Sequence, residues 1–215
     1  MPFLSEDTIN SNGVKVGFWR LDEDGQGLYA LAEAFLSDVE KTVCQNFKND
    51  RRRREWLAAR VLLHEMLGYY PGIEYDGGGC PRIKSLPEMK ISISHTDGLV
   101  AVSLSRQASG IDLERISPRI IRIRDKFLHQ EEFDYVPDNL ALRLLYIQWC
   151  AKEAMYKACN VANYDYQNTY TLPGFRYDGS TSGSAKGRAI LDDGSARMFD
   201  VNYMEIDGCV CCVAC

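Results

Sequence analysis

The stretch KISISHTDGLVAVSLSRQASGIDLE, residues 90–114, decides the fold class of this chain. β-Branched and other apolar residues alternate with small polar ones in three runs, residues 90–95, 99–105 and 109–114. Such alternation over a few residues, bounded by glycine, serine and aspartate, predicts β-strands. Because Asp97-Gly98 is a typical two-residue turn, the runs together predict an antiparallel meander.

Upstream of these strands the periodicity is mainly helical. Residues 14–23 alternate like a strand, whereas residues 28–41 predict an amphipathic helix. Residues 51–70 predict a stronger helix, which Gly68 would end. The glycine-rich residues 74–83 predict a loop.

Downstream, residues 118–136 and 138–160 show helical spacing, and residues 168–215 predict three or four strands with a hairpin at Asp193-Gly194. The order of one strand, two helices and two strands therefore occurs twice. It predicts an α/β chain of the α+β type with two similar halves, residues 1–106 and 107–215. Each half is expected to be an antiparallel sheet packed with helices.

The composition is that of a globular protein that can bury a substantial core, with 215 residues of which 46% are hydrophobic and 26% charged. The net charge of -5 disfavours nonspecific binding to nucleic acid. No apolar run approaches the roughly 20 residues that span a bilayer, and no secretory signal is visible. The eight cysteines are therefore expected to be reduced thiols in a cytoplasmic protein.

Two carboxylates flank Leu113 in the last of the three strand-like runs. Residues two apart on a strand point to the same face, so Asp112 and Glu114 are expected side by side. Such a pair is either a solvated strand face or a cation site. Hard oxygen ligands without a nearby histidine favour magnesium or manganese over zinc.

A second acidic group lies on the long helix predicted after residue 138. Glu153 and Lys157 are four residues apart and share one face of that helix. The pair is either a surface ion pair or part of a site, in which Glu153 would add a third carboxylate to the metal ligands. Lys157 would then add positive charge for a phosphate held by the metal.

Ser94 and His95 lie at the end of a predicted strand, just before a turn. A hydrolase triad is disfavoured, because the chain has no G-x-S-x-G nucleophile motif. Two interpretations remain, a structural histidine and a ligand for phosphate. In the second, the imidazole and the hydroxyl would both donate to phosphate oxygens.

Two further clusters also have alternative interpretations. Residues 51–54 are four arginines at a helix start, where the acidic balance of the chain argues against a nucleic-acid patch. An arginine there suits a nucleotide phosphate, and a solvated helix face explains Arg51 and Arg52. The cysteine-rich residues 208–215 fit a last strand with compact apolar side chains better than a metal site.

The series S-I-S-H, G-I-D-L-E and W-C-A-K-E-A-x-x-K, in this order, closely resembles the Sfp-type 4'-phosphopantetheinyl transferase family. The resemblance runs from about Pro81 to Lys157, with support upstream from R-R-x-x-L-A-A-R. It implies two similar halves about a pseudo-twofold axis, with coenzyme A in the cleft between them. It also implies magnesium-dependent transfer of the phosphopantetheine arm to a serine of an acyl or peptidyl carrier protein.

The resemblance implies roles for individual residues. Asp112, Glu114 and Glu153 would hold Mg2+, with Mn2+ as a substitute. Glu153, or a metal-bound water beside it, would take the proton from the carrier serine. Lys157 and His95 would stabilise charge on the pyrophosphate. The residues implied to contact coenzyme A are Arg54, Pro81, Arg82, Ser94, His95 and Lys157.

The coenzyme A end departs from the family pattern. The family commonly carries G-K-P where this chain has G-C-P at residues 79–81, so Cys80 stands where a phosphate-binding lysine is expected. Arg82 or Lys84 would have to supply the missing charge. Arg54 matches a position near the adenosine 3'-phosphate.

Two other functions stay open on the residues alone. A metal-dependent phosphohydrolase would use the same carboxylates and release phosphate without a carrier. A non-catalytic coenzyme A-binding protein would keep Arg54 and His95 but tolerate loss of Glu153. The expected partners are coenzyme A and an apo carrier protein, with no nucleic acid and no membrane. Since two halves of one chain can build the cleft, we expect a monomer.

Overall fold

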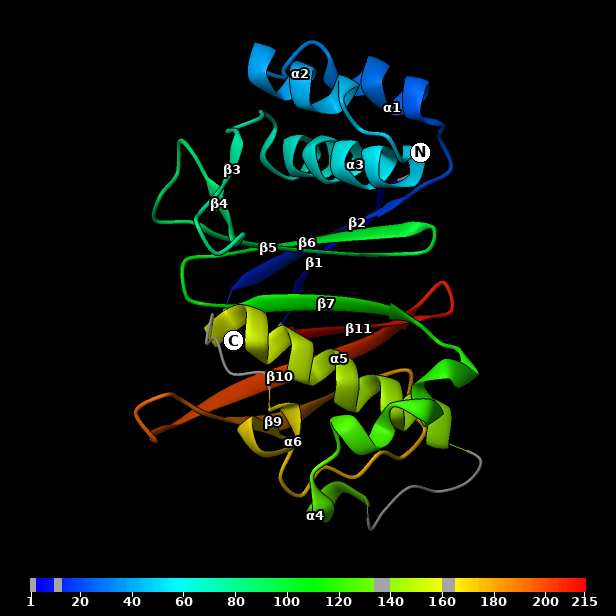
Figure 1. Cartoon of the computed structure of the whole chain (residues 1–215), viewed down its shortest axis with the longest axis vertical. Coiled ribbons are helices and arrows are strands. Elements are labelled where there is room, and N and C mark those ends of the chain that lie inside the picture. The colour runs from blue at the N-terminus through cyan, green and yellow to red at the C-terminus, as the bar shows by residue number, and fades with distance from the viewer. Residues whose placement is uncertain (1–2, 10–12, 134–139, 160–164) are drawn as a thin grey trace. The chain divides into compact units, whose positions relative to one another are not determined.

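Two antiparallel sheets, each with its own helices, make up the computed structural model of the chain (Figure 1). The structure describes residues 3–9, 13–133, 140–159 and 165–215. It divides into a first unit that ends at Gln107 and a second unit that begins at Ala108. The predicted class, antiparallel sheets packed with helices, is confirmed. No helix in the described ranges is long and apolar enough to cross a membrane.

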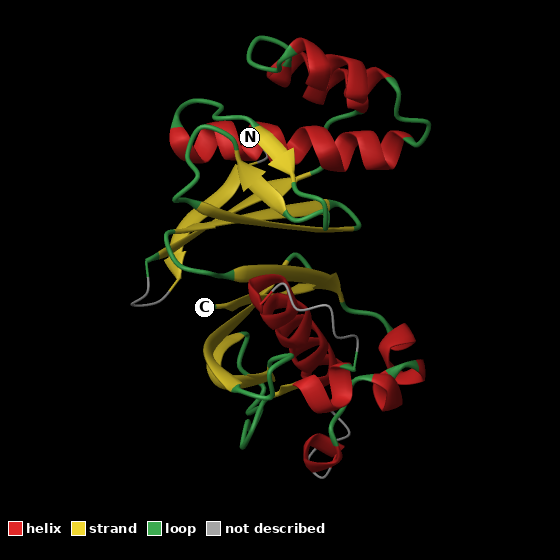
Figure 2. Cartoon of the chain, turned by 60° about the vertical axis from the view of Figure 1, so that its left-hand side comes forward, coloured by secondary structure: helices red, strands yellow, loops and turns green. Residues whose placement is uncertain are grey.

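The first unit is a six-stranded sheet in the order β1-β2-β6-β5-β4-β3. Its strands are β1 (Phe3–Ile9), β2 (Val14–Arg20), β3 (Ile73–Tyr75), β4 (Pro81–Ile83), β5 (Lys90–Thr96) and β6 (Leu99–Ser105). Its helices are α1 (Gly25–Ala32), α2 (Asp38–Gln45) and α3 (Asp50–Leu67). α3 packs on β2 and β6, and α1 packs on α3 (Figure 2). The apolar face of α3 thereby forms the core of this unit.

The single helix predicted over residues 28–41 is wrong, because α1 ends at Ala32 and α2 begins at Asp38. Ser37 is the N-cap of α2 and accepts from the backbone N–H of Glu40, whose carboxylate faces back toward Ser37. This reciprocal capping box satisfies donors at a helix start and so favours a break at this point. Its S-x-x-E pattern was readable in the sequence.

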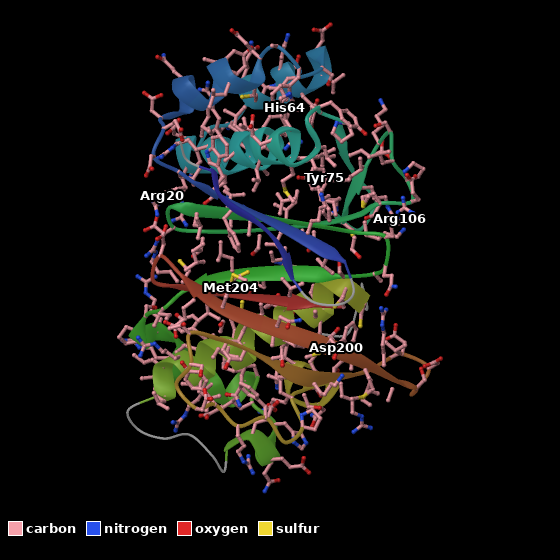
Figure 3. The ribbon with its side chains drawn as sticks, turned by 180° about the vertical axis from the view of Figure 1, so that it is seen from behind. Arg20, His64, Tyr75, Arg106, Asp200 and Met204 are labelled. Carbon is pink, nitrogen blue, oxygen red and sulfur yellow. The ribbon has the colours of Figure 1, made fainter. Side chains whose placement is uncertain are left out.

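Glycine positions account for the other local predictions in this unit. Gly68 ends α3 with φ +74°, and the Asp97-Gly98 turn joins β5 to β6 with Gly98 at φ +83°, so both predictions are confirmed. The predicted loop over residues 74–83 is partly wrong. It contains the short strands β3 and β4, which pair antiparallel around a tight turn; Tyr75 ends β3 (Figure 3).

The second unit is a five-stranded sheet in the order β7-β11-β10-β9-β8, and β10 carries Asp200 and Met204 (Figure 3). Its strands are β7 (Gly110–Arg115), β8 (Tyr170–Thr171), β9 (Ser182–Ile190), β10 (Ala196–Ile206) and β11 (Cys209–Ala214). Its helices are α4 (Gln130–Phe133), α5 (Ala141–Cys159) and α6 (Tyr166–Thr169). α5 packs on β7 and β11 (Figure 1).

The strand pairing and the helix boundaries of this unit decide three predictions. The third strand of the predicted meander is wrong, because β7 pairs with β11 in the second sheet and not with β6. The helix predicted over residues 118–136 is largely wrong, since two 3-10 turns and the short α4 occupy its described part. The late strands with a turn at Asp193-Gly194 are confirmed, as is the terminal cysteine-rich strand, whose cysteines form no disulfide within the described residues.

Gly110, the first residue of β7, permits the close approach of α5. A Cβ built at Gly110 would lie 2.0 Å from the carbonyl oxygen of Ala154 and 2.8 Å from the amide nitrogen of Ala158. Both are backbone atoms of a packed helix and cannot turn aside as a side chain can. The glycine of the G-I-D-L-E motif therefore sets the spacing between β7 and α5.

We expect Gly110→Ala to lower the free energy of unfolding by about 1–3 kcal/mol or more, because the added methyl group forces α5 away from β7. Urea unfolding followed by circular dichroism measures the effect. Gly77→Ala is the matched control, since a Cβ at Gly77 meets nothing within 4 Å, and it should change stability by less than about 0.5 kcal/mol. Equal stability of the two variants would contradict the packing role of Gly110.

Candidate active site

Three carboxylates of the second unit come from two packed elements. Asp112 and Glu114 lie on β7 two residues apart, so strand alternation directs them to the same face, as predicted. Glu153 lies on α5, which packs along β7 (Figure 1). Ile111 and Leu113, which alternate with the two carboxylates along the strand, are buried on its other face and fix the orientation of the strand.

Lys157 joins the helix to the strand. Its ammonium group donates to Asp112 Oδ1 at 2.8 Å and to the carbonyl oxygen of Ile111 at 3.0 Å. Burial lowers the pKa of Lys157, but the charge of Asp112, the hydrogen bond to it and the charge of Glu153 outweigh that effect. The pKa is raised on balance, so Lys157 carries its positive charge throughout the physiological range.

Glu114 is held by an aromatic donor from α5. The indole Nε1 of Trp149 donates to Glu114 Oε1 at 3.0 Å. Burial and then the charge of Asp112 raise the pKa of Glu114, while the Trp149 hydrogen bond and Lys157 oppose them. Trp149 also packs against Tyr166, with the two rings tilted by 31° and their centroids 5.4 Å apart.

Glu153 has the most perturbed carboxyl group of the three. Burial, followed by the charge of Asp112, raises its pKa to about 7, against the lowering effects of Lys157 and a hydrogen bond from Tyr166. A carboxylate whose pKa lies near neutrality can both accept and release a proton at the working pH. Glu153 is therefore suited to the role of general base.

The donor set fits a hard divalent cation in its chemistry. Burial, and after it the negative charge of the neighbouring carboxylates, raises the pKa of Glu114 and Glu153, and a cation among them would relieve the repulsion. Within the described residues, however, no three carboxylate, imidazole or thiolate groups already converge on one metal position. Their contacts include those to Lys157, Trp149 and Tyr166.

Lys152, which precedes Glu153, forms a buried ion pair that the sequence does not predict. Its side chain is fully buried, and its ammonium group lies 2.6 Å from Glu132 Oε2. Glu132 also accepts from the backbone N–H groups of His129 and Leu172, each at 2.8 Å. The pair thus joins α5 to the segments before and after it.

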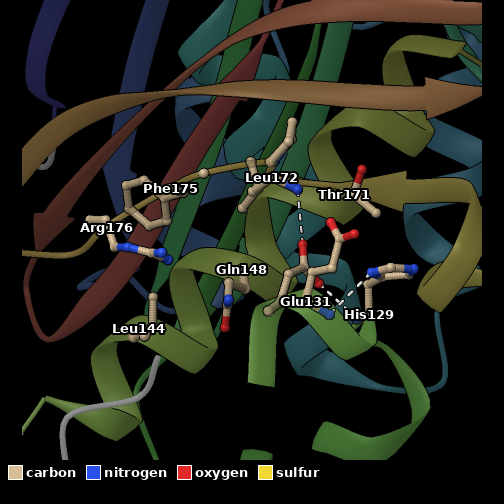
Figure 4. Close-up of a pocket in the computed structure, with 11 residues that line it drawn as sticks. His129, Glu131, Leu144, Gln148, Thr171, Leu172, Phe175 and Arg176 are labelled. Carbon is tan, nitrogen blue, oxygen red and sulfur yellow. Dashed lines mark hydrogen bonds between the residues drawn. The ribbon is translucent and has the colours of Figure 1, made fainter. Parts of the chain in front are cut away.

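A pocket opens beside this buried pair, away from the three carboxylates. It is bounded by the His129–Glu132 segment, the first half of α5 and the Thr171–Arg176 segment (Figure 4). None of Asp112, Glu114 or Glu153 lines it. The candidate active site is therefore defined by the carboxylate cluster and not by this pocket.

Apart from Lys157, the residues expected to contact coenzyme A lie in the first unit, and the structure does not bring all of them together. His95 lies 3.3 Å from Glu55 Oε2 through its Nδ1, and its side chain is 37% exposed. Ser94 is buried, and strand alternation directs it to the face opposite His95. Glu55 belongs to none of the sequence-predicted sites.

The arginines expected at coenzyme A already have partners. Arg54 donates from Nε to the carbonyl oxygen of Glu23 at 2.9 Å and from Nη2 to that of Leu21 at 2.6 Å. Arg82 is paired with Asp76 at 2.8 Å across the turn that contains Cys80 and precedes Pro81. These contacts tie the Arg54 guanidinium group to backbone carbonyl oxygens and the Arg82 guanidinium group to a carboxylate of the same unit.

A strand and a helix that share three coupled carboxylates and a protonated lysine form the kind of site that phosphoryl-transfer proteins use. The family model of the 4'-phosphopantetheinyl transferase superfamily matches residues 108–178, which span both elements. The 4'-phosphopantetheinyl transferase HetI of Nostoc sp. is 30% identical over 163 residues, which cover 67% of this chain and 68% of that protein. The chain belongs to the 4'-phosphopantetheinyl transferase superfamily, as its motifs predict.

Two other relatives align over shorter or more divergent segments. The 4'-phosphopantetheinyl transferase psf-1 of Bacillus pumilus is 26% identical over 146 residues, 63% of each chain. The 4'-phosphopantetheinyl transferase gsp of Aneurinibacillus migulanus is 30% identical over 88 residues, 40% of this chain and 37% of that protein.

Proposed function

We propose that this chain transfers the 4'-phosphopantetheine group of coenzyme A to a serine of an apo acyl or peptidyl carrier protein. The observation that carries the proposal is the coupled cluster of Asp112, Glu114, Glu153 and Lys157. It lies within the segment that matches the family, and the relatives of the chain are named as transferases of this group.

Each residue of the cluster has a defined task in the proposed reaction. The serine oxygen attacks the β-phosphorus of coenzyme A, the bond to the bridging oxygen breaks, and adenosine 3',5'-bisphosphate leaves. Glu153, whose pKa burial and the charge of Asp112 raise to about 7 in the absence of metal, accepts the serine proton. Lys157 offers its charge to the phosphate oxygens from its position beside Asp112. Asp112, Glu114 and Glu153 would hold Mg2+, which when bound supplies positive charge to the pyrophosphate.

The coenzyme A contacts proposed for the first unit are Arg54, Pro81, Arg82, Ser94 and His95. The Asp76–Arg82 pair affects whether Arg82 can supply the positive charge that is missing where Cys80 replaces the usual phosphate-binding lysine. Since Arg82 is already neutralised by Asp76, it would have to exchange this partner for a phosphate.

We propose that residues 1–106 and 107–215 together form one transferase unit, active as a cytoplasmic monomer.

Residues 116–127, which follow β7, support a docking surface for an acidic carrier protein. Four cationic side chains are exposed there, together with Ile121, which is 47% exposed. The segment follows Glu114 directly along the chain, and Phe127 at its end packs on Trp149, the partner of Glu114. The cationic residues are Arg119, Arg122, Arg124 and Lys126.

We expect the double change Arg119→Glu and Arg122→Glu to raise KM for the carrier about tenfold while kcat stays within about threefold, because it replaces attraction by repulsion at the docking step. The loss should shrink as salt screens the charges. Arg188→Glu, an exposed position on β9, is the matched control and should leave KM unchanged. An equal effect of both changes would argue against a localised docking surface.

Product analysis separates this function from its rivals. The transferase releases adenosine 3',5'-bisphosphate from coenzyme A only when apo carrier is present. A phosphohydrolase would release phosphate without any carrier, and a non-catalytic coenzyme A-binding protein would release neither product. Chromatography of reactions with and without carrier distinguishes the three outcomes, and carrier-independent hydrolysis would overturn the proposal.

A further inference from the structure

We propose that Glu55 is a positioning residue that holds His95 with both ring nitrogens protonated, ready to donate to a phosphate of coenzyme A. The inference rests on the proposed function, since it takes coenzyme A as the ligand of His95. Glu55 lies at the first unspecified position of the R-R-x-x-L-A-A-R pattern, directly after Arg54.

The geometry places the Glu55 carboxylate between two cationic groups. Oε1 accepts from Arg51 Nε at 2.8 Å, one helical turn earlier on α3. Oε2 faces His95 Nδ1 at 3.3 Å, from the neighbouring β5. Each oxygen therefore serves a different partner, and Arg51 also lies 3.9 Å from Asp97 in the turn that follows β5.

Strand alternation explains why His95 faces α3. Ile91 and Ile93 lie on the same face of β5 as His95, and both pack in the core that α3 covers. His95 continues this row at the strand end, where the core gives way to solvent. Its ring is thus bounded by Glu55 on the inner side while 37% of its side chain remains exposed.

Burial makes the Glu55 charge effective. The Glu55 side chain is 3% exposed, and a buried carboxylate must be paired with cations or hydrogen-bond donors. Its field is also screened less by salt than that of a surface pair. A hydrogen on Nδ1 of His95 is therefore favoured, and so is the positive charge of the whole ring.

The protonation state decides what His95 offers a phosphate. A neutral ring with its hydrogen on Nδ1 presents Nε2 as an acceptor, which repels a phosphate oxygen. The doubly protonated ring presents Nε2–H as a charged donor, the stronger kind of hydrogen bond. Arg51, Glu55 and His95 together carry a net charge of +1 in that state and zero when the ring is neutral.

The decisive experiment is an NMR pH titration of the histidine rings in the full-length protein, with His95 assigned by its loss in His95→Gln. We expect Glu55→Gln to lower the pKa of His95, because the amide removes the negative charge behind the ring. Arg51→Gln is the matched variant and should shift the pKa of His95 in the opposite direction, since the whole Glu55 charge is then left to the ring. If Glu55 had only a structural role, the two variants would not shift the pKa of His95 in opposite directions.

Binding of coenzyme A with Mg2+, measured by calorimetry, gives the second readout. Glu55→Gln should weaken binding about tenfold at pH values between the two His95 pKa values, where the ring is charged in one protein and neutral in the other. The ratio should shrink at lower pH, where both rings are protonated. In a His95→Gln background, Glu55→Gln should have almost no further effect on affinity.

The outcomes separate this inference from the proposed function. If wild-type protein transfers phosphopantetheine but Glu55→Gln leaves the pKa of His95 and the affinity unchanged, the role of Glu55 is overturned. If wild-type protein neither binds coenzyme A nor modifies a carrier, the proposed function falls, and the titration still decides whether Glu55 controls His95. Should Glu55→Gln fail to fold, Glu55→Asp replaces it, and an unchanged His95 pKa with the shortened, more distant carboxylate would equally count against the role.

Discussion

Glu153→Gln is expected to lower the rate of phosphopantetheine transfer by about a thousandfold or more, because one group serves both as metal ligand and as base. The amide keeps the shape of the side chain but cannot accept the serine proton or offer a charged oxygen to Mg2+. Steady-state transfer to an apo carrier measures the loss. Glu131→Gln, an exposed position outside the cluster, should retain wild-type activity, whereas wild-type rates in Glu153→Gln would show that the site is misassigned.

The same variant makes a prediction about stability in the absence of metal. Burial and the charge of Asp112 raise the folded-state pKa of Glu153 to about 7, above its ordinary value of 4.5. Ionised Glu153 therefore destabilises the fold, and this cost appears as pH rises from about 4.5 through 7. We expect Glu153→Gln to melt at or above the wild-type Tm at pH 8 and the difference to vanish at pH 4. A lower Tm at pH 8 would contradict the assigned environment.

Lys152→Met is expected to lower the free energy of unfolding by about 3–5 kcal/mol, since it leaves the buried Glu132 carboxylate without its cation. The pair is buried on both sides, with the lysine 0% and the glutamate 5% exposed. Chemical denaturation measures the loss, and adding Glu132→Gln to Lys152→Met should recover part of it because no uncompensated charge then remains.

An exposed ion pair of the same unit supplies the control. Lys186 on β9 pairs with Asp200 on β10, and both side chains are largely solvated, the lysine at 69% (Figure 3). Lys186→Met should change stability by less than about 1 kcal/mol, as exposed pairs usually do. If Lys152→Met cost no more than Lys186→Met, the buried pair would not hold α5 to its neighbours in the way described.

The elements that the sequence predicted well are those specified by local chemistry. The β5–β6 hairpin follows from alternation and a glycine turn, and α3 follows from its apolar spacing and Gly68. The apolar spacing continues across residues 33–37 and therefore predicts one helix in place of α1 and α2. The capping box of Ser37 and Glu40 is the local signal that indicates the break. The change of sheet at β7 could not be predicted, because its partner β11 lies nearly a hundred residues later.

The candidate site divides in the same way. Strand alternation placed Asp112 and Glu114 on one face without any structure. Glu153 comes near Asp112 and Glu114 because α5 packs on β7. The spacing of residues does not predict this packing, and only the resemblance to the family implied it. The contacts that tune these groups could not be predicted, because Tyr166 and Glu132 lie on the four-residue helices α6 and α4, which are too short to show a periodic pattern.

The central claim is tested most directly by the intact mass of an apo carrier protein after incubation with this chain and coenzyme A. With Mg2+ present we expect each modified carrier to gain one phosphopantetheine group; with a chelator it should gain none until excess Mg2+ is added. Both an acyl and a peptidyl carrier are offered, so that carrier choice does not decide the result. No mass gain on either carrier, or an equal gain with the chelator present, would contradict a transferase that works through the carboxylates of β7 and α5.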